Sequence, residues 1–89
     1  MKHLLEQLTR AADLPDEAIP GLPLVEIAGD RRVLIEHHLG VTQYSSCQIC
    51  IKVKFGHICV SGQCLVMTRM VADQLIITGR IDNVSIFRG

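Results

Sequence analysis

The segment QICIKVKFGHICVSGQCLVMTRM, residues 48–70, decides the expected fold. Apolar residues alternate with polar ones as far as Phe55, and the alternation resumes at Ile58 after Gly56-His57. This period of two is typical of strands, and the interruption is typical of a turn. With Gly56-His57 as a two-residue loop, Phe55 pairs with Ile58. The same register pairs Val53 with Val60.

A second turn led by glycine is expected at Gly62-Gln63. It places Val60 opposite Leu65 and Ile58 opposite Met67, so both turns put the apolar side chains on one face of the sheet. A one-residue slip would move a whole strand's side chains to the other face, and the agreement therefore supports this register. The segment predicts a three-stranded antiparallel meander.

The composition indicates one small domain and argues against two classes of partner. The chain has 89 residues, 48% of them hydrophobic, with nine basic and nine acidic residues. A neutral chain with few aromatic residues lacks the basic field and stacking platforms that nucleic acids require. No apolar run reaches the length of a membrane span, and no signal peptide is recognisable. We expect a cytoplasmic protein, and its near-zero net charge favours a homo-oligomer.

Residues 1–23 are expected to form an N-terminal helix and a proline-rich connector. An amphipathic helix is predicted from Lys2 to Asp13, because its apolar residues repeat at helical spacing. It would pack on an open face of the sheet, or alternatively bind a membrane surface or a partner. Pro20-Gly21-Leu22-Pro23 then connects it to an all-β domain over residues 24–89.

Outside the central segment, short strands are expected from Leu24 to Ile27, Arg32 to His38 and Val41 to Tyr44. The continuous apolar run Val33-Leu34-Ile35 suggests burial on both sides. A final hairpin is expected from Gln74 to Phe87.

The turn of that last hairpin is predicted at Asp82-Asn83, which pairs Ile81 with Val84. Gly79 then lies inside a strand, where glycine marks a bulge or a close backbone approach. The fold class is mainly β, an antiparallel meander forming a rolled sheet or small sandwich. The resemblance between residues 60–64, VSGQC, and residues 77–81, ITGRI, leaves a short β-solenoid as the alternative.

The four cysteines are expected to be reduced and to pack as small apolar residues. Cys47 and Cys50 have the CxxC spacing, but on a strand they point to opposite faces, Cys47 toward the core. Cys59 and Cys64 lie on the same face as Cys50. Cys64 is expected diagonal to Cys59 on the neighbouring strand, about 7 Å away, which is too far for an easy disulfide. The alternative is a metal site with Cys50, Cys59 and Cys64 as the ligands, or a thiol-redox site that uses all four cysteines.

Other candidates for chemistry are sparse. His37, His38 and His57 are expected on the surface or in turns, and no catalytic or nucleotide-binding motif is present, so neither enzymatic activity nor a cofactor is expected. Exposed basic residues could instead hold an acidic partner, and the candidates for that contact are Lys52, Lys54 and Arg69.

A series of short motifs resembles the YqfC branch of the YabP/YqfC family of sporulation proteins. The motifs lie between residues 14 and 87 and are Leu14-Pro15, Leu22-Pro23, VLIEHHLGV at 33–41, Tyr44-Ser45, VKFG at 53–56, VSG at 60–62 with Leu65, and IITGRI at 76–81. In this family the position of His37 is more usually Asn, and the four cysteines are not a hallmark. The family supplies no catalytic or binding residues to carry over.

The resemblance implies a non-enzymatic protein of an endospore-forming bacterium. Such a protein is made in the mother cell, is needed for spore development or envelope assembly, and accompanies the sporulation membrane protein YqfD. It would then be cytoplasmic in the mother cell and peripheral at the forespore membrane. The leading hypothesis is thus a structural or adaptor protein acting through protein contacts. A small metal or thiol-redox protein and a self-assembling β module are the rivals.

Overall fold

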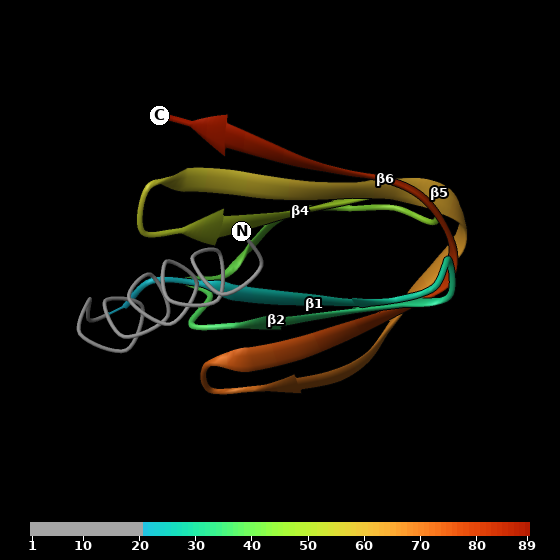
Figure 1. Cartoon of the computed structure of the whole chain (residues 1–89), viewed down its shortest axis with the longest axis horizontal. Coiled ribbons are helices and arrows are strands. Elements are labelled where there is room, and N and C mark those ends of the chain that lie inside the picture. The colour runs from blue at the N-terminus through green and yellow to red at the C-terminus, as the bar shows by residue number, and fades with distance from the viewer. Residues whose placement is uncertain (1–20) are drawn as a thin grey trace, which may run out of the picture.

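The computed structural model describes residues 21–89, which form one open antiparallel sheet of six strands (Figure 1). The strand order is β1-β2-β6-β5-β4-β3. The strands are β1 (Leu24–Ala28), β2 (Arg32–Glu36), β3 (Val41–Tyr44), β4 (Gln48–Val53), β5 (Gly56–Val71) and β6 (Gln74–Arg88). The described part of the chain contains no helix, and the helix predicted from Lys2 to Asp13 lies outside it.

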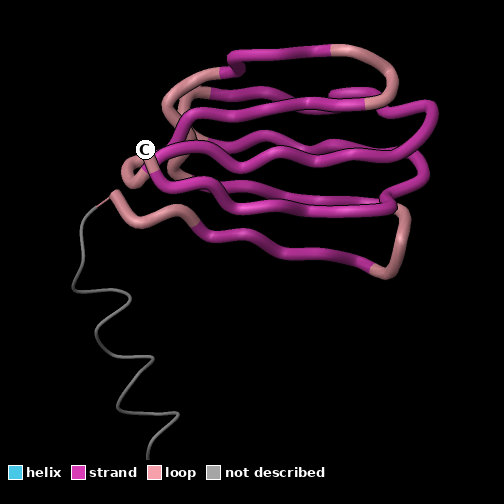
Figure 2. The backbone as a smooth tube through the Cα atoms, turned by 90° about the horizontal axis from the view of Figure 1, so that it is seen from above, coloured by secondary structure: helices cyan, strands magenta, loops and turns pink. Residues whose placement is uncertain are grey.

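The predicted mainly β, antiparallel architecture is confirmed. Figure 2 shows that strands make up nearly the whole described chain, with short connections at their ends. Every strand pairing is antiparallel, so the solenoid alternative, which stacks parallel strands, is wrong.

The sheet folds over on itself because β5 and β6 are long and bend together. The first half of β5 pairs with β4 and with the second half of β6. The first half of β6 pairs with β2 and with the second half of β5. We call the first group, completed by β3, the β4 layer, and the second group, completed by β1, the β2 layer. In Figure 1 the two layers face each other, joined by the bends of β5 and β6.

The core fills the space between the two layers. It is built from one face of each layer and consists of Val33, Ile35, Ile49, Ile51, Val53, Ile58, Val60, Leu65, Leu75, Ile77 and Ile81. The expectation that β2 is buried on both sides is wrong. Val33 and Ile35 are fully buried, whereas Leu34 between them is only half-buried, because β2 presents a single face to the core.

The bend of each long strand requires a glycine at a close backbone contact. A Cβ on Gly62 would lie 1.8 Å from the carbonyl oxygen of Arg80. A Cβ on Gly79, whose φ is +136°, would lie 2.5 Å from the carbonyl oxygen of Cys64. The similar segments 60–64 and 77–81 are therefore the two corners of the folded sheet, facing each other, and the prediction that Gly79 marks a close approach within a strand is confirmed.

Loops from the two layers hold these corners in the same way. The amide of Gly62 donates to Cys47 O at 3.0 Å, in the loop before β4. The amide of Gly79 donates to Arg31 O at 3.1 Å, in the loop before β2. Each bend is thus tied to the loop of a neighbouring hairpin, and the two halves of the sheet repeat one construction.

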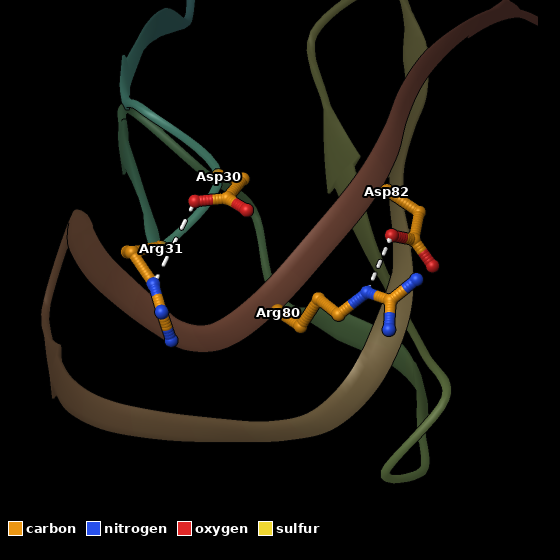
Figure 3. A network of polar contacts seen from close by, with 4 residues as sticks. All are labelled: Asp30, Arg31, Arg80 and Asp82. Carbon is orange, nitrogen blue, oxygen red and sulfur yellow. Dashed lines mark hydrogen bonds and ion pairs between the residues drawn. The ribbon is translucent and has the colours of Figure 1, made fainter.

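Figure 3 shows two ion pairs at the second of these corners. Arg31 Nε lies 3.6 Å from Asp30 Oδ1, and Arg80 Nε lies 3.2 Å from Asp82 Oδ1. All four side chains are exposed, so these pairs contribute little beside the backbone contacts.

The first predicted turn is displaced. Val53 pairs with Gly56, so the loop is Lys54-Phe55 and not Gly56-His57. Gly56 is needed elsewhere, because a Cβ there would lie 2.0 Å from Phe87 O on β6. The change moves each pairing by four positions, an even number. The predicted core face of β4 and of the start of β5 is therefore retained although the pairs themselves are wrong.

The second and third predicted turns do not exist. Gly62-Gln63 lies within β5 and Asp82-Asn83 lies within β6, so both the three-stranded meander and the terminal hairpin are wrong. In each case a bend was mistaken for a reversal. The chain reverses instead at Ala72-Asp73, within the segment expected to be a connection.

Two histidines form hydrogen bonds to the backbone at the chain reversal between β5 and β6. His38 is only 7% exposed; its Nδ1 accepts from the Gly40 amide at 3.1 Å, and its Nε2 donates to Val71 O at 3.3 Å. The expectation of a surface or turn histidine is wrong for His38, because two backbone partners satisfy both ring nitrogens in a buried position. His37 adopts φ +64°, and its amide donates to Asp73 O.

The corner contact predicts that Gly79→Ala destabilises the protein by at least about 2 kcal/mol, from an unfavourable φ and a backbone clash. Gly29→Ala is the matched control. Gly29 also has positive φ, at +57°, but no atom lies within 4 Å of its added Cβ. It should cost about 1 kcal/mol. Urea unfolding measures both, and equal losses would contradict the corner contact.

The left-handed backbone at His37 predicts the order of its variants. His37→Asn should match or exceed the parent in stability, because Asn tolerates this region best after glycine. His37→Val should lose at least about 1 kcal/mol. Thermal unfolding checks both, and a valine variant as stable as the asparagine variant would contradict the assigned conformation.

Candidate functional site

The folded sheet has four unpaired strand edges among the described residues. β1 and β3 end the sheet order. In addition, the second halves of β5 and β6 each pair with a strand on one side only. Each layer is thus four strands wide with two open edges. Unpaired edges present backbone donors and acceptors to which another strand can add.

The exposed large apolar side chains gather along these edges. Leu24 and Ile27 lie on β1, Tyr44 on β3 with Leu39 shortly before it, and the remainder on the second halves of β5 and β6: Val66, Met70, Val71, Ile86 and Phe87. Exposed apolar groups that recur at open edges are typical of protein contact sites. These edges are therefore the candidate functional site.

Two of the four edges are partly closed within the chain. The Tyr44 hydroxyl, on the edge of the β4 layer, accepts from the amide of Met67 at 3.2 Å, on the edge of the β2 layer. The pairing of β3 also shifts between Val41 and Gln43, and that of β5 shifts between Met67 and Arg69. Such irregularities bend an edge and hinder the addition of a strand.

The cysteines are arranged differently from the expectation. The observed register sets Cys50 opposite Cys59, and the two form a disulfide. The prediction that all four cysteines are reduced is wrong for this pair, because the displaced turn had set Cys59 away from Cys50. Both are buried, at 6% and 8% exposure. Cys47 and Cys64 are free and exposed, so the prediction that Cys47 faces the core is also wrong.

The three proposed metal ligands do not converge. Cys50 and Cys59 are bonded to each other, and Cys64 is exposed at the corner of β5. Within residues 21–89 no three His, Cys, Asp or Glu side chains form a group that could hold a metal ion. In the same range no buried polar side-chain atom lacks a hydrogen-bond partner, so none is left aimed at a ligand.

The basic candidates lie in two different places. Lys52 is exposed on the outer face of β4, opposite His57, and Lys54 is exposed in the loop that follows. Arg69 is exposed on the second half of β5, in the β2 layer. Their contact with a partner stays a prediction, and the structure divides it between two layers.

Sequence reasoning missed the edge sites on β5 and β6, because both strands were expected to end at turns. One signal was available. Ile86-Phe87 places two large apolar residues side by side, so one of them must face away from the core on any strand.

No helix in the described part of the chain is long and apolar enough to cross a membrane.

Comparison with known proteins gives one family. The sequence model of the YabP family matches residues 23–87. The chain is also similar to a protein of Bacillus subtilis (strain 168) that bears the name "Uncharacterized protein YqfC". The two are 29% identical over 75 residues, which is 84% of this chain and 81% of that protein. No solved structure matches the chain. With nearly all of its described residues covered by the family model, this chain belongs to the YabP family.

Proposed function

We propose that this protein is a non-enzymatic component of spore development that joins other proteins through its sheet edges. Membership of the YabP family supports the sporulation role, which the sequence resemblance implies for this family. On this proposal the protein is made in the mother cell of an endospore-forming bacterium. It works there as a structural or adaptor protein of the developing envelope.

The observation that carries the adaptor role is the coincidence of open edges with exposed apolar side chains. A partner strand added at an edge gains main-chain hydrogen bonds and covers the apolar groups there. The β1 edge suits a partner of different sequence. Leu24 and Ile27 flank Glu26 in the middle of β1, and that carboxylate favours a basic residue opposite and opposes a second acidic one.

The membrane protein YqfD is the partner we propose, with contact at the forespore membrane. Lys52 on the outer face of β4 and Lys54 beside it supply positive charge for an acidic cytoplasmic segment of such a partner. Exposed charges of this kind chiefly steer association and select the partner. The protein would then be peripheral to the membrane and held there by YqfD.

Co-purification from sporulating cells tests this proposal. A tagged parent protein should recover YqfD, and a fluorescent fusion should lie at the forespore surface. Lys52→Glu should lower the recovered YqfD several-fold, because it reverses a charge on the proposed contact. Arg32→Glu is the matched control, since Arg32 is exposed on β2 in the other layer, and should recover the parental amount. Recovery of no envelope or membrane protein would contradict the adaptor role.

A thiol-redox function is the second candidate, because the protein contains a disulfide between Cys50 and Cys59. The burial of this disulfide, however, favours a structural role for it. Reactive cysteines are partly exposed in electropositive surroundings, whereas Cys50 and Cys59 are nearly inaccessible. Native protein purified without reductant should show two titratable thiols, from Cys47 and Cys64, and four after unfolding and reduction.

Replacing both Cys50 and Cys59 by Ala should cost about 2 to 3 kcal/mol, as expected for the loss of a crosslink over a short loop. Sporulation should persist wherever the variant stays folded. Spore counts and urea unfolding are the measurements. Loss of sporulation in a folded double variant, or stoichiometric zinc in the parent protein, would favour the thiol or metal function.

A further inference from the structure

The second half of β6 is the one open edge of the described sheet that is regular, uncovered and free of a central charge. Residues 83–88 pair in unbroken register with residues 56–61 of β5, and no segment of residues 21–89 pairs with their other side. The edges of β3 and β5 are bulged, and Tyr44 joins them. The β1 edge has Glu26 at its centre, which would meet its own copy in a symmetric pairing.

The sequence of this edge is complementary to itself. Around Ser85 as the centre, an antiparallel pairing with a second copy sets Ser85 opposite Ser85 and Val84 opposite Ile86. Both apolar residues lie on the core side of the strand, where they pair with Val60 and Ile58 of β5. Ile86 is 61% exposed in the single chain, and this pairing would cover it with a β-branched neighbour.

The charges at the two ends of the segment fit the same pairing. Arg88 ends the segment, and Asp82 stands just before it, at the bend of β6 where the register shifts. Each is three residues from Ser85. In the dimer centred on Ser85, Asp82 of each copy borders the end of the paired segment where Arg88 of the other copy lies, so opposite charges approach each other at both ends. In the single chain the Asp82 carboxylate forms an ion pair with the exposed side chain of Arg80. The Asp82 side chain nevertheless remains 47% exposed and accessible to a second copy.

We infer that the second half of β6 binds a second copy of this chain, giving a twofold symmetric dimer. The two β4 layers then join edge to edge into one continuous sheet, and each copy closes the edge that the other leaves open. The partner is a copy of the chain because complementarity about one residue is a property of a twofold interface. The near-zero net charge of the chain allows the two copies to approach. The inference goes beyond the proposed sporulation role and does not depend on it.

Sedimentation of the full chain at several concentrations tests this dimer. The parent should dimerise reversibly. Asp82→Arg and Arg88→Asp should each raise the dissociation constant about tenfold, because each sets like charges together at both ends of the interface. An equimolar mixture of the two variants should restore the parental affinity, since the introduced arginine then lies beside the introduced aspartate. Arg32→Asp, the same charge change as Arg88→Asp but on β2 in the other layer, is the control and should leave the constant unchanged.

Three results would overturn the inference. A parent that stays monomeric at every concentration would exclude the interface and leave this edge to a different protein. A dimer that resists both charge variants would place self-association elsewhere. Weakened variants whose mixture does not recover would mean that the charges act within one chain. Both substituted side chains are exposed, so we expect every variant to fold. Thermal unfolding of each variant checks this.

Discussion

The whole structure depends on the two close backbone contacts at the corner where the paired strands β5 and β6 bend together. Gly62 lies against the carbonyl of Arg80, and Gly79 lies against the carbonyl of Cys64. Neither position has room for a Cβ, so the glycines allow both strands to turn the corner while remaining paired. Without these contacts the sheet would stay flat and its apolar face would be exposed to water. The core exists because the corners bring two halves of one sheet face to face.

The same corners generate the candidate functional site. Because the long strands change partners at the bend, each ends with a half-strand that has a neighbour on one side only. A small protein that folds one sheet over itself therefore gains a core and at the same time acquires four open edges. The edges of β3 and β5 are partly closed through Tyr44, whereas those of β1 and β6 remain open. That difference gives the protein one edge suited to an unlike partner and one suited to its own copy.

Much of the fold could be predicted from sequence, since a period of two identifies strands and their core face. Ile49, Ile51 and Val53 are buried as the alternation requires. The pairings could not be predicted, because glycine serves both in turns and in close contacts, and a single sequence does not distinguish them. For that reason the sequence pattern predicts turns at Gly56 and Gly62, where the structure has close backbone contacts. The error at Gly56 then displaced Cys59 from its true position opposite Cys50.

The site was less predictable than the fold, since an edge exists only once the strand order is known. At position 37, the residue expected from the family resemblance suits the backbone conformation that the structure shows. His37 adopts φ +64°, a conformation that Asn accepts readily, and Asn is the residue that the family resemblance leads us to expect there.

The most direct test of this account is amide hydrogen exchange at the two corners, measured residue by residue by NMR. The amides of Gly62, Leu65, Gly79 and Ile81 each donate to a loop carbonyl. The account predicts that these amides are protected to nearly the same degree as those of the core strands, because opening a corner requires separation of the layers. Exchange at the corners as fast as at Ala72-Asp73, with the core strands still protected, would contradict it. Such a result would mean that β5 and β6 do not pass through the bends as continuous strands.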